Sequence, residues 1–160
     1  FELCGVFGTP NVRVFSFYPP GNDPAFDPAG WPAHRDEVIR RMGAMAELAA
    51  ASKVVLFHEN EHRIYGDSPE RVRDVLESVN SPALRGAYDA ANYAYCGYDP
   101  VAGWEKTKDH TAHLHIKDWY AGGHDAGHKW GVLAGHGDGH VAYSTRDAVN
   151  RGYHGFAVLE

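Results

Sequence analysis

The sequence predicts an α/β fold in which parallel strands alternate with outer helices. Five short apolar segments have the composition of strands, and stretches with helical spacing or helix-capping residues lie between them. Alternation of this kind favours a parallel sheet with helices packed outside it. The 160 residues are 44% hydrophobic and 22% charged, which is typical of a globular domain that can bury a core. We expect a single domain over residues 1–160.

The first strand and the first helix have the clearest patterns. Residues 12–18 are rich in β-branched and aromatic residues, and Pro19-Pro20-Gly21 ends this predicted strand. A loop rich in Pro, Gly and Asp runs to about Pro32. A helix then spans about residues 35–51, where four apolar residues are spaced for one buried face: Val38, Met42, Met45 and Ala49.

The same pattern then repeats along the chain. Residues 54–58 form the second predicted strand, which ends at Glu59. Ser68 can cap the next helix, and Pro69 suits its first position. A loop rich in Gly and His is expected over residues 122–139. The remaining predicted strands span residues 85–89, 112–116 and 155–160, with helices at about 101–108 and 145–151.

Composition excludes several classes of protein. The formal net charge of −6 argues against a broad nucleic-acid surface, because phosphate binding depends on clustered Lys and Arg. No apolar run reaches the roughly 20 residues of a membrane helix. Two cysteines are too few for a disulfide framework, which favours a reduced, cytoplasmic setting. No secretion signal is visible, and the chain begins with Phe1, so we expect a further segment upstream.

Four predicted strands end with a side chain that can bind metal: Glu59, Asp89, His115 and Glu160. In a parallel sheet the carboxyl ends of all strands lie on one side, so these distant residues are expected to converge. Three carboxylates and one imidazole suit a divalent ion. A single carboxylate at a strand end is more often a helix cap or a solvated residue, and a single strand histidine is usually a hydrogen-bonded core residue. Spacing alone leaves both interpretations open.

Short motifs surround these positions. In chain order they are His58-Glu59-Asn60-Glu61, Ile64-Tyr65-Gly66-Asp67, Tyr88-Asp89-Ala90-Ala91-Asn92-Tyr93, His115-Ile116-Lys117-Asp118, Ala134-Gly135-His136-Gly137-Asp138-Gly139 and Gly152-Tyr153-His154-Gly155-Phe156. Their order and spacing resemble the sugar phosphate isomerase/epimerase family, over about residues 12–160. The resemblance implies a TIM (β/α)8 barrel of the xylose-isomerase-like type, of which the chain carries the last five strands. The first three strand–helix units and the helix after Glu160 are then absent.

The resemblance also implies a metal site and a chemistry. Family members bind one divalent metal through a Glu, an Asp, a His and a Glu, which match Glu59, Asp89, His115 and Glu160. Mn²⁺ or Mg²⁺ is expected, with Zn²⁺ or Co²⁺ as alternatives. In ketose epimerases of this group the two glutamates also move the proton, so Glu59 and Glu160 are the predicted catalytic pair. The implied activity is isomerisation or epimerisation of a monosaccharide, sugar acid or sugar phosphate through a metal-stabilised enediolate.

A second group of residues is predicted to bind substrate. Asn92 stands where these epimerases often carry a substrate-binding His, and their substrate-contacting Arg has no counterpart among residues 120–123. Lys117 shares a strand face with the metal-binding His, and Arg13 is expected to enter the barrel. An internal ion pair is the alternative role for both. His136 lies in a glycine-rich segment expected over the site. The other loop histidines are expected to be solvated: His124, His128 and His140.

Alternative functions remain open from the sequence. An inosose-dehydratase-like lyase would use the same fold, and a non-catalytic barrel fragment would keep the ligands without a closed pocket. Phosphodiester cleavage like that of the related apurinic endonucleases is disfavoured, because a larger set of histidine ligands and a DNA-facing basic surface are not evident. The expected partner is a small sugar, with no nucleic acid and no membrane. A homo-oligomer stays open, since a five-stranded section has two exposed edges.

Overall fold

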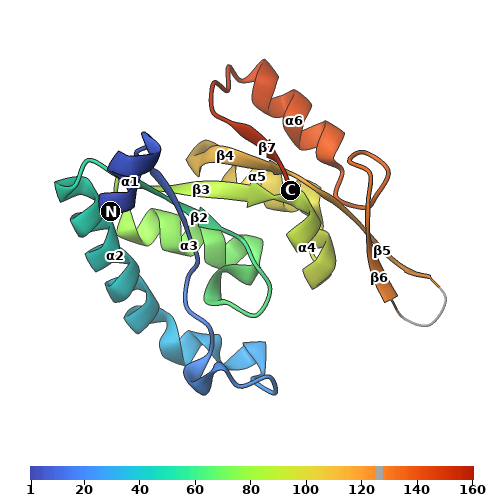
Figure 1. Cartoon of the computed structure of the whole chain (residues 1–160). Coiled ribbons are helices and arrows are strands. Elements are labelled where there is room, and N and C mark those ends of the chain that lie inside the picture. The colour runs from blue at the N-terminus through green and yellow to red at the C-terminus, as the bar shows by residue number, and fades with distance from the viewer. Residues whose placement is uncertain (125–127) are drawn as a thin grey trace.

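A parallel sheet of five strands, in the order β1-β2-β3-β4-β7, forms the centre of the computed structural model (Figure 1). The described residues are 1–124 and 128–160. The strands are β1 (Asn11–Val14), β2 (Val55–Glu59), β3 (Leu84–Asp89), β4 (Thr111–Ile116) and β7 (Ala157–Leu159). All five predicted strands are confirmed, although the first and the last are shorter than expected. The strand order and parallel pairing are those of a section of a TIM barrel.

Helices connect these strands and lie on the outer side of the sheet (Figure 1). The longer helices pack in succession, α2 against α3, α3 against α5, and α5 against α6. They are α2 (Arg35–Ala51), α3 (Pro69–Val79), α5 (Pro100–Thr107) and α6 (Val141–Asn150). The shorter elements are the helices α1 (Glu2–Phe7) and α4 (Ala90–Cys96) and the 3-10 helices η1 (Pro20–Asn22), η2 (Pro28–His34), η3 (Tyr65–Asp67) and η4 (Lys108–His110).

The hydrophobic core lies between the helices and the sheet. Its large buried members come from both layers and include Met42, Leu56, Val75, Tyr88 and Trp104. Burying an apolar side chain of this size contributes roughly 1.5–3 kcal/mol, so this layer stabilises the packing of the helices on the sheet. None of the described helices is long and apolar enough to cross a bilayer.

An antiparallel hairpin follows β4, where the sequence predicts a loop. Its strands are β5 (Asp118–His124) and β6 (His128–Val132), and Asp118 pairs with Val132. The prediction of a loop over residues 122–139 is therefore wrong for residues 122–124, which lie in β5, and for residues 128–132, which form β6. Glycines and histidines interrupt the β-branched and aromatic pattern on which strand prediction depends, so the hairpin has no clear signal in the sequence.

Helix α4 is a second element that the sequence pattern does not predict. It has seven residues, too few to show a helical period, and it starts directly after β3. Asp89 caps it, because its Oδ1 accepts a hydrogen bond of 2.8 Å from the backbone N–H of Asn92. The cap fixes the orientation of the Asp89 carboxylate at the carboxyl end of the strand.

Candidate metal centre

Four side chains from four different strand ends meet at one side of the sheet. Glu59 and Asp89 are the last residues of β2 and β3, His115 lies near the end of β4, and Glu160 directly follows β7. Parallel pairing sets Asp89 beside His115 and His115 beside Val158, two residues before the final Glu. One ligand atom from each of the four lies within 4.8 Å of the others. The predicted convergence is present in the structure.

His115 approaches all three carboxylates of this group. Its Nδ1 atom lies 2.9 Å from Oε1 of Glu59, 3.5 Å from Oδ2 of Asp89 and 3.5 Å from Oε2 of Glu160. The side chains of Glu59 and Asp89 are almost completely buried, whereas that of Glu160 is 36% exposed. The site is therefore closed on the side of the sheet and open toward the last strand.

The chemistry of these donors fits a divalent cation. Oε2 of Glu59 and Oδ2 of Asp89 are buried without a hydrogen-bond partner among the described residues, although basic side chains approach both as ion pairs. Buried carboxylate oxygens require neutralisation by a cation or a hydrogen bond. Oxygen and imidazole donors together suit Mn²⁺, Mg²⁺ or Zn²⁺. The donor set therefore fits a dication, and Nδ1 of His115 is the imidazole nitrogen that lies close to the three carboxylates.

Two asparagines hold the buried carboxylates in place. Asn60 joins β2 to β3, because its Oδ1 accepts from the N–H of Asp89 at 2.9 Å and its Nδ2 donates to the carbonyl of Asp89 at 2.8 Å. Nδ2 of Asn92 donates to Oε1 of Glu59 at 3.3 Å and to the carbonyl of Asn60 at 2.9 Å. Asn92 was predicted to bind substrate, and in the structure its amide contacts a ligand carboxylate. Asn60 stands in the motif His58-Glu59-Asn60-Glu61, but the sequence does not predict this role for it.

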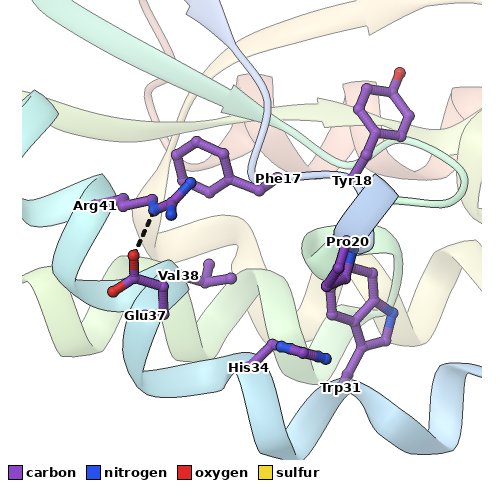
Figure 2. A pocket seen from close by; sticks show the side chains of 8 residues that line it. All are labelled: Phe17, Tyr18, Pro20, Trp31, His34, Glu37, Val38 and Arg41. Carbon is purple, nitrogen blue, oxygen red and sulfur yellow. Dashed lines mark hydrogen bonds and ion pairs between the residues drawn. The ribbon is translucent and has the colours of Figure 1, made fainter. Parts of the chain in front are cut away.

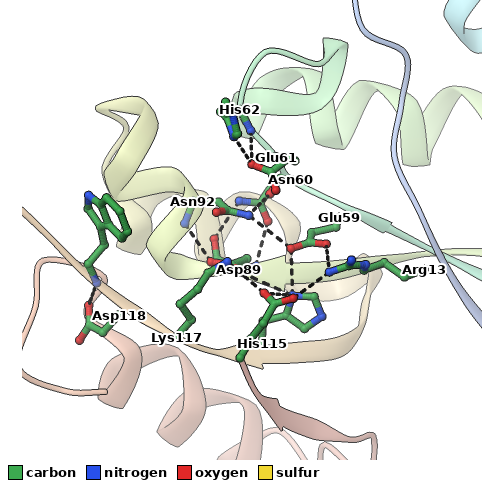
Figure 3. Close-up of polar contacts among 12 residues, drawn as sticks. Arg13, Glu59, Asn60, Glu61, His62, Asp89, Asn92, His115, Lys117 and Asp118 are labelled. Atoms are coloured by element: carbon green, nitrogen blue, oxygen red, sulfur yellow. Dashed lines mark hydrogen bonds and ion pairs between the residues drawn. The ribbon is translucent and has the colours of Figure 1, made fainter. Parts of the chain in front are cut away.

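Two basic side chains lie against the carboxylates, as Figure 3 shows. NH1 of Arg13 is 2.8 Å from Oε1 of Glu160 and 3.1 Å from Oε2 of Glu59. Nζ of Lys117 is 2.9 Å from Oδ2 of Asp89 and 2.9 Å from Oε2 of Glu160. The sequence predicts that both residues bind substrate, with an internal ion pair as the alternative, and in the structure both form ion pairs with the carboxylates.

The carboxylates shift the pKa values of their neighbours. Burial favours the neutral form of His115, but the neighbouring carboxylates of Asp89 and Glu59 outweigh burial and raise its pKa to about 9. Burial also disfavours the charge of Lys117, yet the negative charge of Asp89 raises its pKa above the usual value. Because a metal replaces the proton on a histidine ligand, occupation of this centre is expected to release a proton.

The glycine-rich segment after β6 is tied to β5 through Asp118. This carboxylate accepts hydrogen bonds of 2.8 to 2.9 Å from four backbone N–H groups, those of Trp119, Gly135, Gly137 and Gly139. His136, predicted to bind substrate, is exposed in this segment and is not a member of the cluster of ligand atoms found among the described residues. His140 is exposed at the start of α6. The side chains of His124 and His128 lie outside the described part of the structure.

A hollow of about 190 Å³ lies apart from these ligands, beside the first residues of α2 (Figure 2). Aromatic side chains line it, among them Phe17 and Trp31. Its charged groups already contact one another, because Arg41 pairs with Glu37 at 2.7 Å and stacks over the ring of Phe17. None of the four ligand residues lines this hollow, so the metal centre remains the candidate functional site.

A parallel strand–helix array with polar ligands at the carboxyl ends of its strands is the arrangement of a TIM-barrel enzyme. The family model for the xylose isomerase-like TIM barrel matches residues 1–160. The chain therefore belongs to this family. No curated protein matches the sequence significantly.

Solved structures share the fold at low sequence identity. A xylose isomerase-like TIM barrel protein from Mycobacterium smegmatis in complex with magnesium is 19% identical, with a TM-score of 0.75 over 99% of this chain and 56% of that chain. A probable 3-DHS dehydratase from Bacillus anthracis is 19% identical, with a TM-score of 0.73 over 99% of this chain and 60% of that chain. D-allulose 3-epimerase from Methylomonas sp. is 16% identical, with a TM-score of 0.69 over 99% of this chain and 52% of that chain. The chain thus spans little more than half the length of these proteins.

Proposed function

We propose that the protein is a divalent-metal-dependent isomerase or epimerase that acts on a monosaccharide, sugar acid or sugar phosphate. The observation that carries this proposal is the convergence of the four ligand atoms within 4.8 Å of one another. Similar folds in sugar epimerases support it. A dication held by Glu59, Asp89, His115 and Glu160 supplies Lewis-acid polarisation of a carbonyl oxygen and of the neighbouring hydroxyl.

Glu59 and Glu160 are the proposed proton-transfer residues. They come from strands separated by β3 and β4 in the sheet, yet both carboxylates contact the same guanidinium NH1 of Arg13. The two carboxylates therefore lie close to one another although their strands are not neighbours. One carboxylate removes the proton from the carbon next to the carbonyl, and the other returns a proton to the opposite face. Asn92 keeps the first of these carboxylates oriented through its contact with Oε1.

Solvent-proton exchange tests this assignment. In deuterated water, the full-length protein with Mn²⁺ is expected to exchange the proton next to the carbonyl of its ketose substrate, identified from a panel by NMR. Glu59→Gln and Glu160→Gln are each expected to slow exchange by about 10²–10⁴-fold. The exposed Glu105→Gln is the matched control and is expected to exchange at the unmodified rate.

Full exchange by both site variants would contradict the assignment of the two glutamates. Loss of water from the substrate, instead of proton exchange, would favour the alternative lyase chemistry. Metal binding without either reaction across the panel would favour a non-catalytic role.

A further inference from the structure

We infer that the substrate of the proposed metal centre is an anion whose carboxylate lies between Arg13 and Lys117, next to the reacting carbon. This inference rests on the proposed function and narrows its substrate class to sugar acids and related hydroxy acids. It depends on the positions of the two basic side chains and on the summed charge of the described side chains that form the centre.

Arg13 and Lys117 lie on opposite sides of Glu160. The guanidinium NH1 of Arg13 contacts Oε1 of this carboxylate at 2.8 Å, and Nζ of Lys117 contacts Oε2 at 2.9 Å. Each also contacts a second ligand carboxylate, that of Glu59 at 3.1 Å and that of Asp89 at 2.9 Å. Both cations are therefore part of the centre itself. They come from β1 and from the residue after β4, at two sides of the ligand set.

The charges of the site leave a positive surplus once a dication is bound. The three ligand carboxylates contribute −3, the two basic side chains +2 and the dication +2, which leaves +1 with neutral His115 as ligand. The nearby acid Asp118 is already satisfied by four backbone N–H groups, and Glu61 contacts its neighbour His62. A site that is partly removed from water favours a ligand that neutralises such a surplus.

The position of the surplus indicates a carboxylate and not a remote phosphate. Arg13 and Lys117 approach the same carboxylate oxygens that would hold the metal, at 2.8 to 3.1 Å. A group bound by these cations therefore lies within a few bonds of the atoms that the metal polarises. A planar carboxylate next to the hydroxyl or carbonyl meets this requirement, and the guanidinium of Arg13 suits it geometrically. A terminal phosphate on a sugar chain lies farther from the reacting carbon.

Calorimetric binding to the full-length protein tests this inference without turnover. The probes are D-gluconate, D-glucitol and D-glucitol 6-phosphate, which share a six-carbon chain and differ in the terminal group. With Mg²⁺ bound, D-gluconate is expected to bind at least 10-fold more tightly than both other probes. Lys117→Met and Arg13→Leu are each expected to weaken D-gluconate binding by about 10-fold while changing D-glucitol binding by less than 2-fold.

Lys108→Met is the matched control, because Lys108 pairs with Glu105 on α5 and not with a metal ligand. It is expected to leave all three affinities unchanged.

Equal binding of D-gluconate and D-glucitol by a protein that holds Mg²⁺ would overturn the inference and leave the proposed function intact. A preference for D-gluconate that persists in both site variants would also overturn it, since direct contact with the metal would then explain the preference. Tighter binding of D-glucitol 6-phosphate would assign a remote phosphate instead. Failure to bind Mg²⁺ would overturn the proposed function itself.

Discussion

At the scale of single residues, Asn60 links the two buried ligand carboxylates. Its side chain bonds both the N–H and the carbonyl of Asp89, and its own carbonyl accepts from Asn92, which in turn contacts Glu59. The asparagine is 1% exposed, so these partners cannot be replaced by water without rearrangement. The position of Asp89 therefore depends on a residue that is not itself one of the four candidate ligands.

Asn60→Ala is accordingly expected to weaken Mn²⁺ binding by about 10–100-fold, the usual cost of losing a residue that orients a metal ligand. Isothermal titration calorimetry measures this change. The control is Asn150→Ala, at the exposed end of α6, which is expected to keep the unmodified affinity. Unchanged Mn²⁺ binding by a folded Asn60→Ala protein would show that the link between the strands is dispensable.

A second residue, Asp74, joins α2 to α3 and predicts a dependence of stability on pH. It accepts hydrogen bonds from Nε of Arg35 at 2.9 Å and from the hydroxyl of Tyr65 at 2.7 Å. Burial raises its pKa, but these bonds and that from Ser78 outweigh burial and lower it. Because the folded-state pKa lies below the unfolded value, the stabilisation is fully present above about pH 4. It is lost as the pH falls through the lower, folded-state pKa.

Asp74→Asn is therefore expected to lower the free energy of unfolding by about 1–3 kcal/mol at pH 7. The difference from the unmodified protein is expected to shrink as the pH falls from 4 toward 2.5, as measured by urea unfolding. Asp36→Asn is the control, because Asp36 contacts the same arginine but is 98% exposed. A constant difference between the Asp74→Asn and unmodified proteins at every pH would exclude the charge of Asp74 as the cause.

At the scale of elements, the β5–β6 hairpin and the segment after it depend on a close approach of backbone to Asp118. A Cβ atom on Gly137 would lie 2.4 Å from Oδ1 of Asp118 and 2.6 Å from the carbonyl oxygen of Trp119. This position therefore requires glycine for reasons of space. By contrast, a Cβ atom on Gly131, in β6, would meet no atom of the described residues within 4 Å apart from its chain neighbours.

Gly137→Ala is consequently expected to destabilise the protein by about 1–3 kcal/mol, the usual range for a group forced into a filled space. Gly131→Ala is the control and is expected to change stability by less than about 0.5 kcal/mol. Urea unfolding of the two variants compares them directly. Equal stabilities would mean that the segment can move away from Asp118 at little cost.

The elements also show which parts of the fold the sequence could predict. Helix α2 is predictable because its buried residues Val38, Met42 and Ala49 recur at helical spacing. Helix α3 is predictable because Ser68 and Pro69 mark its start, and the Ser68 hydroxyl accepts from the N–H of Arg71. The sequence does not predict helix α4 or the hairpin, because α4 is too short to show a helical period and glycines and histidines interrupt the strand pattern of the hairpin.

At the scale of the whole molecule, the site is a consequence of strand order. Glu59 and Glu160 are distant in sequence, and the register of the parallel sheet places both strand ends at the same side. The convergence of the four candidate ligands could therefore be predicted from the ends of strands, whereas their role as metal ligands is what the family resemblance implies. The bonds of Asn60 could not, because a motif does not specify which of its polar atoms will be buried or what they will contact.

The most direct test of the shared metal centre is crystallographic. Diffraction from crystals of the full-length protein grown with Mn²⁺ is collected at the manganese absorption edge, and the anomalous difference map locates the ion. We expect a single strong peak at about 2.0–2.6 Å from one donor atom of each of Glu59, Asp89, His115 and Glu160. A map in which these side chains surround no peak, or in which the ion binds elsewhere, would contradict the account.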